Sequence, residues 1–410
     1  MQYKEIKHTT KWTKNKLIKF SIFSILIILV FLEISFRILF SSQNAKYHNS
    51  ISVQGSPLQI SDSVLIFKNA PFYLDYYKKF QRNEEGMKSA LGDEFIPVKK
   101  PEDFWVLLTG ASAMEGMGSN RNNDWLDITG VDDHSYDMTI SFYLQNFLQA
   151  QMPKKKVRVF NGAFSTAVLF QSYHRYIQLE QKLQPDWVVS MDGVNDPSTL
   201  TRNETVEEKV KDEWDDRPQF HYPLKLIIPI TSHSAFFNFV KQKMFAIKQT
   251  LRSNAAIKGD FPFRKKWANY KAPAIRLTPL NENIKRAVDS FCTTLLKYDS
   301  LLIKDGRKHL LLVQPHMFHR DTTLLTNVEK AVNNYYRSVF QDYDKQAFLK
   351  EIYNRFLNDG VHNNIISMLA VHHWRSNVFV DYCHFSDDAT LKIAQGIAEY
   401  ILSDGKKEIF

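Results

Sequence analysis

The sequence predicts an α/β fold in which a parallel sheet is covered by helices on both faces. Short apolar runs alternate along the chain with longer helical patterns. Several of these runs are continuously apolar, which is typical of strands buried on both faces. The chain has 410 residues, of which 44% are hydrophobic and 24% are charged. It can therefore form one large domain with a substantial core.

The strands and helices are expected where these patterns begin and end. The run 104–109 leads into Gly110, and Pro315 follows the run 309–314. We expect strands at residues 104–109, 157–160, 187–191, 309–314 and 377–380. We expect helices at about residues 140–151, 166–183, 283–304, 328–357 and 387–402. Sheets of this kind carry their sites at the carboxyl ends of the strands.

The N-terminus has the pattern of a membrane anchor. Six lysines precede residue 20, and an apolar run follows over residues 20–40. Glu33 and Arg37 interrupt the run but are four residues apart, so they can pair on one face of a helix. The lysines place the N-terminus in the cytoplasm and the remaining chain outside it. A cleaved signal peptide and a buried helix are the alternatives, although no A-x-A-like site follows Phe40.

We therefore expect four regions. They are a basic cytoplasmic tail (1–19), a single-pass transmembrane anchor (20–40), a stalk and lead-in segment (41–100) and an extracytoplasmic domain (101–410). Two stretches, at about 120–137 and 201–280, exceed the minimal α/β pattern. They are interpreted as insertions that overhang the site, as a lid or a sugar-binding wall, or that pack on the helices.

Charge and cysteine content exclude some classes of protein. The net charge of +9 comes partly from the N-terminal lysines, and no nucleic-acid-binding module is recognisable, so we expect no nucleic-acid partner. Two cysteines, Cys292 and Cys383, are too few for a disulfide framework. The sequence leaves open whether they pair with each other.

Four short motifs supply the residue types that an acyl-transfer site needs. Ser112, in Gly110-Ala111-Ser112, is a candidate nucleophile; the alternative is a serine that caps a helix. His384, in Asp381-Tyr-Cys-His384, is a candidate base that Asp381 can orient. Asn195, in Gly193-Val-Asn195-Asp196, can aim an amide at a developing oxyanion, or simply belong to a turn. Asn161-Gly162 is the fourth motif.

In this order, the motifs resemble the four blocks of the SGNH, or GDSL-type, hydrolase family. The resemblance covers roughly residues 103–199 and 305–402, and residues 185–196 are its most specific part. It implies a flavodoxin-like three-layer α/β/α sandwich. It also implies that Ser112 is the nucleophile, His384 the base and Asp381 its partner. The oxyanion hole would then consist of the Ser112 backbone N–H, a glycine N–H and the Asn195 side chain.

Two positions depart from the family pattern. The usual Gly-Asp-Ser is Gly110-Ala111-Ser112 here, which costs little because that aspartate is not a triad member. The oxyanion glycine usually falls several residues after the asparagine, where this chain has Ser165-Thr166. Either Gly162 serves in its place, or a backbone N–H near Thr166 does.

We expect no metal or cofactor. Histidines occur at His316-x-x-His319 and His372-His373, but a zinc site needs three or four convergent ligands with clear spacing, and this sequence has no such spacing.

These observations predict a membrane-anchored serine esterase that removes O-acyl groups, acetyl in the first instance, from envelope carbohydrate or lipid. The location also suggests the machinery that builds envelope polysaccharide as a partner. One alternative is an O-acyltransferase of an extracytoplasmic polysaccharide that uses the same residues, with water excluded. The other is a non-catalytic envelope scaffold or glycan-binding module. The sequence does not give the acyl group, the acceptor or the oligomeric state.

Overall fold

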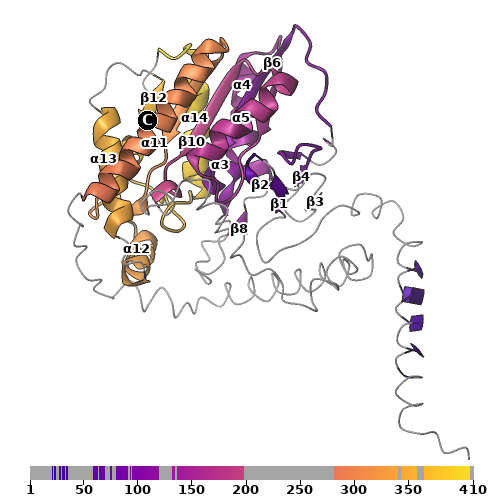
Figure 1. Cartoon of the computed structure of the whole chain (residues 1–410), viewed down its shortest axis with the longest axis horizontal. Helices are drawn as coiled ribbons and strands as arrows, with labels where there is room; N and C mark the ends of the chain where they lie inside the picture. The colour runs from indigo at the N-terminus through magenta and orange to yellow at the C-terminus, as the bar shows by residue number, and fades with distance from the viewer. Residues whose placement is uncertain are drawn as a thin grey trace, which may run out of the picture.

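The computed structural model describes most of the domain that the sequence predicts (Figure 1). The described residues are helical positions between 21 and 35 and residues 59–62, 64–69, 74–75, 80–90, 93, 95–119, 132–133, 136–197, 281–339, 343–357 and 364–406. The predicted insertion 201–280 lies outside them, as does most of the insertion 120–137.

A central sheet organises the domain, and five of its strands are parallel. The parallel strands are β6 (Asp103–Gly110), β9 (Lys156–Asn161), β10 (Trp187–Asp192), β11 (Lys308–Val313) and β12 (Ile365–Ser367). Their spatial order is β12-β11-β10-β6-β9. Numbered along the chain this order is 2-1-3-4-5, which is the order of flavodoxin-like sheets.

Helices cover both faces of this sheet, so the domain has three layers (Figure 1). Side chains alternate along β6, with Val106 and Leu108 in one core cluster and Trp105 and Leu107 in the other. The first cluster contains residues of α4 (Ile140–Gln151), α12 (Asn327–Val339) and α14 (Asp387–Leu402). The second contains residues of α5 (Leu169–Leu183), α11 (Glu282–Lys304) and α13 (Tyr343–Leu357).

Local capping fixes where several helices begin. The side chain of Thr139 accepts a hydrogen bond from the Phe142 N–H at the start of α4, and Ser386 accepts one from Ala389 at the start of α14. Asn281 does the same for α11. The observed bounds of α4 and α14 are those predicted. The predicted helix 328–357 is instead two helices, α12 and α13.

Residues before the first parallel strand extend the sheet. Strands β3 (Leu74–Asp75), β4 (Phe80–Arg82) and β5 (Lys88–Ala90) continue it beyond β9 in antiparallel pairing. The sheet is therefore mixed. Part of the predicted stalk and lead-in segment (41–100) belongs to the folded domain. Outside the main sheet, β1 (Gln59–Asp62) pairs with β2 (Ile66–Asn69), and β7 (Met117–Ser119) pairs with β8 (Asp132–Asp133).

The predicted fifth strand at residues 377–380 is wrong. The fifth parallel strand is β12, and within 377–380 only an isolated antiparallel bridge forms, between Phe379 and Phe385. The backbone N–H groups of Val378 and Phe379 donate instead to the Glu329 carboxylate, at 2.9 and 3.2 Å. A buried side chain thus replaces the strand partner that this apolar run would otherwise need.

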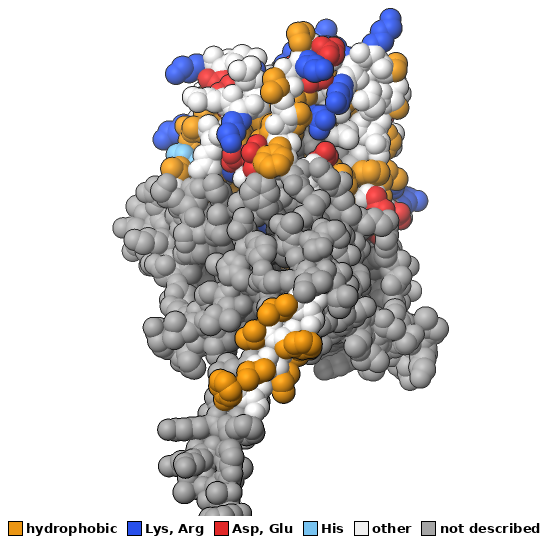
Figure 2. Space-filling model, turned by 90° about the vertical axis from the view of Figure 1, so that its right-hand side faces the viewer, with side chains coloured by type: hydrophobic (Ala, Val, Ile, Leu, Met, Phe, Trp, Pro, Cys, Tyr) orange, Lys and Arg blue, Asp and Glu red, His pale blue; other side chains and the backbone are white. Residues whose placement is uncertain are grey.

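The predicted transmembrane anchor lies largely outside the described residues. In the part of the chain that the structure describes, no helix is both long enough and apolar enough to cross a membrane. The described residues between 21 and 35 are helical, and their large apolar side chains are exposed along the helix (Figure 2). Those more than half exposed are Phe23, Ile27, Ile28, Val30, Phe31 and Ile34. The anchor remains a prediction.

Candidate active site

Ser112 lies in a tight turn between β6 and the short helix α3 (Ser112–Glu115). Gly110 closes β6 with a φ of 134°, and a Cβ there would lie 2.5 Å from the Met191 carbonyl oxygen of the adjacent strand. Only glycine fits this approach. Ala111, not Ser112, occupies the cap position of α3. The serine is therefore presented at the carboxyl end of a central strand rather than used as a cap.

His384 and Asp381 complete a hydrogen-bonded chain with this serine. Ser112 Oγ lies 2.6 Å from His384 Nε2, and His384 Nδ1 lies 2.6 Å from Asp381 Oδ2. The second carboxylate oxygen of Asp381 accepts the backbone N–H groups of Cys383 and His384, at 2.8 and 2.7 Å. All three members of the chain are buried. The structure thus brings together the three residues that the motifs predicted.

The charges in this chain determine which nitrogen of His384 carries a proton. Burial of Asp381 favours its neutral form, yet the charge of His384 and the bonds from His384 and Cys383 keep its pKa below the ordinary value. An ionised carboxylate only accepts hydrogen bonds, so His384 Nδ1 is the donor. In the neutral ring Nε2 is then an acceptor, and the Ser112 hydroxyl donates to it.

The basicity of His384 follows from the same pairing. Burial, the largest single effect, lowers the pKa of the ring, but the charges of Asp381 and Cys383 and their hydrogen bonds together outweigh it, and the pKa is raised well above its ordinary value. The imidazole is therefore a strong proton acceptor. A histidine with this environment suits general-base chemistry on a serine hydroxyl.

The loop that carries Asp381 and His384 is held from several sides. Gln314, at the end of β11, donates its amide to the Cys383 carbonyl at 2.8 Å. Glu329 accepts the N–H groups at 378 and 379 and also binds Arg320; both charged side chains are fully buried. Arg320 in turn donates to the Ser376 carbonyl at 2.7 Å. These bonds fix the base relative to the sheet.

Gly118 brings a second segment close to this loop. Its φ is 126°, and a Cβ there would lie 2.5 Å from the Phe385 carbonyl oxygen and 3.1 Å from His384 Cβ. The close approach of β7 to the His384 loop therefore requires the absence of a side chain at this position.

Gly162 is not available as an oxyanion donor, and that prediction is wrong. Its N–H is donated to the Leu108 carbonyl of β6 at 2.8 Å, as a continuation of the sheet ladder. Asn161 has a structural role, because its side-chain amide donates to the Met114 carbonyl at 3.0 Å. Thr166 has a φ of 65° in an exposed position of the same loop. A β-branched residue in this left-handed region is a rare and strained conformation.

Asn195 is anchored to that same loop. Its Nδ2 donates to the Ala167 carbonyl at 2.9 Å, which orients the amide. Beneath it, the buried carboxylate of Asp196 accepts the N–H groups of Leu169 and Gly193. Burial and the charge of Asp192 raise the pKa of Asp196 to about 8, and burial raises that of Asp192 to about 6.

A buried ion pair beside the nucleophile has no counterpart in the sequence motifs. Arg82 of β4 donates to Glu115 Oε1 at 2.6 Å, and both side chains are almost completely buried. The other carboxylate oxygen of Glu115 accepts the Ser165 hydroxyl at 2.6 Å. Glu115 is three residues after Ser112, which is the only sequence signal that could have drawn attention to it.

Three histidines of the His316-x-x-His319 and His372-His373 motifs form an aromatic cluster. The rings of His316, His319 and His372 lie with centroids 6.2–6.3 Å apart in successive contacts. Burial lowers the pKa of His319 to about 4 and that of His372 to about 3, so both are neutral at pH 7. In the part of the chain that the structure describes, the group with metal-ligand spacing is Asp381, Cys383 and His384. Cys292 and Cys383 are both free thiols.

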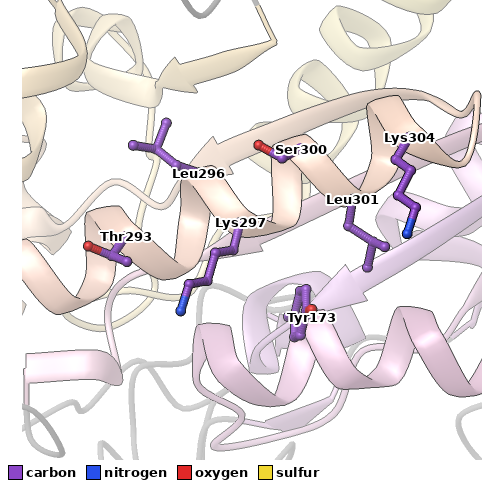
Figure 3. Close-up of a pocket in the computed structure, with 7 residues that line it drawn as sticks. All are labelled: Tyr173, Thr293, Leu296, Lys297, Ser300, Leu301 and Lys304. Atoms are coloured by element: carbon purple, nitrogen blue, oxygen red, sulfur yellow. The ribbon is translucent and has the colours of Figure 1, made fainter.

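A shallow, open hollow lies elsewhere on the surface, between α11 and α5 (Figure 3). Its volume is about 470 Å³, and it contains none of the residues of the proposed triad. The residues that line it are Tyr173, Thr293, Leu296, Lys297, Ser300, Leu301 and Lys304. The candidate site is thus defined by its hydrogen bonds and not by this hollow.

Comparisons with known proteins add little to this geometry. No protein-family model matches the chain, and no curated protein matches it significantly. Among solved structures, the chain is similar to a carbohydrate acetylesterase family member from Sinorhizobium meliloti, at 13% identity and a TM-score of 0.33, covering 74% of this chain and 100% of that one.

It is also similar to a catalytic mutant of Axe2, an acetylxylan esterase from Geobacillus stearothermophilus, at 13% identity and a TM-score of 0.33, with coverage of 76% and 98%. A third is LAE5, an α/β hydrolase enzyme from the metagenome of Lake Arreo, Spain, at 12% identity and a TM-score of 0.30, with coverage of 74% and 94%. Similarities this weak carry no argument about function, which rests on the geometry of Ser112, His384 and Asp381.

Proposed function

We propose that this protein is a serine esterase of the SGNH type. The observation that carries the proposal is the buried chain of hydrogen bonds from Ser112 through His384 to Asp381, with both links at 2.6 Å. A hydroxyl, a base and a carboxylate in this arrangement activate the hydroxyl as a nucleophile. This chain of hydrogen bonds joins Ser112 to residues that are far away in the sequence, so local turn or capping preferences do not explain it.

The reaction proceeds through an acyl-enzyme. The Ser112 oxygen attacks the ester carbonyl carbon while its proton passes to His384 Nε2. The tetrahedral intermediate then expels the alcohol, which takes that proton from His384. Water repeats the sequence on the acyl-enzyme: His384 accepts its proton, the carboxylic acid leaves and the serine hydroxyl is restored. Asp381 stays ionised throughout and stabilises the imidazolium.

The oxyanion is stabilised by donors on both sides of the nucleophile. The Ser112 N–H lies in the first turn of α3, where backbone N–H groups have no partner within the helix. The loop at Thr166 and the amide of Asn195, which is bonded to that loop, supply the others. In this arrangement the backbone N–H of Thr166 takes the role that the sequence suggested for Gly162. Thr166 has the left-handed conformation that a glycine would adopt without strain.

The substrate class follows from the predicted location. The lysine-rich tail and the exposed apolar helix support a membrane anchor with the domain outside the cytoplasm. We propose O-acyl groups, acetyl in the first instance, on envelope carbohydrate or lipid as substrates. An acyltransferase would use the same residues, with a sugar hydroxyl in place of water.

Covalent labelling tests the proposal. Full-length protein in detergent is treated with a fluorophosphonate probe, beside the Ser112→Ala variant and a Ser141→Ala control. Ser141 is also a buried serine, but it lies in α4. We expect labelling of wild type and control, none of Ser112→Ala, and cleavage of p-nitrophenyl acetate only by the labelled proteins. Equal labelling of Ser112→Ala and wild type would refute the assignment.

A further inference from the structure

We infer that Glu115, held by Arg82, is a positioning residue that fixes the oxyanion donor at Thr166; the inference rests on the esterase function proposed above. Glu115 is not within the hydrogen-bonded triad. It instead links the nucleophile turn, the strand β4 and the loop 161–167. Glu115 belongs to the nucleophile turn itself, is bound to β4 through Arg82 and is bound to the loop through Ser165.

The Ser165 hydroxyl is the link to the loop. It lies 2.6 Å from Glu115 Oε2 and 3.0 Å from Met117 Sδ, and the charged carboxylate is the stronger acceptor of the two; Ser165 is buried, so this bond is shielded from water. Glu115 Oε1 is simultaneously bound by Arg82 at 2.6 Å. With both oxygens engaged, the carboxylate cannot rotate, and the position of Ser165 is set relative to the turn that carries Ser112.

The peptide between Ser165 and Thr166 directly follows the Ser165 side chain that Glu115 holds. The Thr166 hydroxyl donates to the Ser165 carbonyl at 2.6 Å. In a planar trans peptide the N–H points opposite to the C=O, so the placement of Ser165 also influences the direction of the Thr166 N–H. The loop is tied to the nucleophile turn a second time, because Phe164 N–H donates to the Gly110 carbonyl at 3.1 Å.

Arg82 has an electrostatic role as well. A bare carboxylate three residues from Ser112 would oppose the negative charge that develops on the substrate oxygen. The guanidinium neutralises Glu115 in a buried environment, where such effects are larger than in water. This explains why a strand from the lead-in segment, β4, is part of the domain: it delivers the cation that the site requires.

Ser165→Ala is the primary test, because it removes the link to the loop and leaves the Arg82–Glu115 pair intact. Complete loss of an oxyanion donor lowers turnover by about 10²–10³. We expect misplacement to lower kcat for p-nitrophenyl acetate by about tenfold or more, with KM nearly unchanged. The rate of fluorophosphonate labelling should fall in parallel. The acid limb of the pH profile, which reports His384, should not move. Ser165→Thr, which keeps the hydroxyl, should restore most of the activity.

Tyr176→Phe is the matched control. Tyr176 also donates a hydroxyl hydrogen bond to a carboxylate, Asp305, at 2.8 Å, but this bond lies where α11 ends. The Tyr176→Phe variant should have a lower Tm than wild type but an unchanged kcat. Glu115→Gln should lower kcat at least as much as Ser165→Ala does, and the double variant should be no worse than Glu115→Gln alone, since both act through one bond.

The outcomes separate the two proposals. If wild type labels and cleaves ester but Ser165→Ala retains its kcat and shows only a lower Tm, Glu115 is a structural residue and the inference fails alone. If kcat falls but the pH profile shifts with it, the variant has disturbed the triad and the inference also fails. If wild type neither labels nor cleaves ester, the proposed function fails and the inference with it.

Discussion

His384 Nδ1 lies 2.6 Å from Asp381 Oδ2, and neither side chain is more than a tenth exposed. Asp381 raises the pKa of His384, and His384 lowers the pKa of Asp381. Each group is therefore charged more readily than it would be if it were buried alone. This relationship controls the pH at which the proposed base can accept a proton.

We predict an acid limb of kcat/KM with its midpoint above pH 6.5. His384 must be neutral to act as a base, and its pKa is raised, so the active form accumulates only as pH rises through that higher value. Asp381→Asn should lower kcat by about 10³–10⁴ and move the limb to lower pH, because the stabilising charge is gone. Both are measured as pH profiles of ester cleavage. A limb that stayed in place in Asp381→Asn would show that another group titrates.

Gly118→Ala should impair catalysis as well as stability. Its φ of 126° lies outside the regions that residues with a side chain readily adopt, and the new Cβ would also collide with the Phe385 carbonyl beside His384. The base would then be displaced from Ser112.

Gly306→Ala is the control for this substitution. Gly306 also has a positive φ, 67°, but a Cβ there meets nothing within 4 Å. We expect a smaller fall in Tm in Gly306→Ala, because its φ lies in the left-handed α region that other residues can adopt, and a fall in kcat only in Gly118→Ala. Equal kcat values in the two variants would argue against a tight packing requirement at the His384 loop.

The buried pair Asp192 and Asp196 should make the folded state less stable as pH rises. Their pKa values in the folded protein, about 6 and about 8, exceed the ordinary value, so the folded state binds more protons than the unfolded state between about pH 4 and 8. Stability therefore falls with increasing pH across that window. Asp192→Asn should flatten this dependence. Ser172 and Ser190, which donate to Asp192, can accept from an amide instead.

Urea unfolding midpoints at pH 5 and pH 8 measure this effect. The exposed Asp388→Asn variant serves as the control and should retain the wild-type difference between the two midpoints. If Asp192→Asn shows the same difference as wild type, Asp192 does not bind the extra protons.

The elements that sequence reasoning located well are those with local signals. Helix α14 begins where Ser386 caps it, and α4 begins where Thr139 does, so both bounds could be read from neighbouring residues. The run 377–380 was misread because nothing local reveals that Glu329, some fifty residues earlier, accepts its backbone N–H groups. The true edge strand, β12, has only three residues and gives almost no pattern.

The residues of the candidate site can also be divided into those with a local sequence signal and those without one. Ser112, Asp381, His384 and Asn195 stand in recognisable motifs, and the structure places the first three in one hydrogen-bonded chain. The role of Gly162 could not be read, because its N–H is consumed by pairing with Leu108 on another strand. Arg82 and Glu115 are joined across 33 residues without any periodic pattern. Such long-range pairs depend on the register of the sheet, which a single sequence does not specify.

The bond between Ser112 and His384 joins residues 272 positions apart in the chain. During synthesis from the N-terminus, the serine therefore exists for most of the process as an ordinary alcohol, with no base to activate it. Contacts of such separation are also slow to form, so reactivity is acquired at the end of folding rather than along the way. A chain interrupted before residue 384 would be chemically inert.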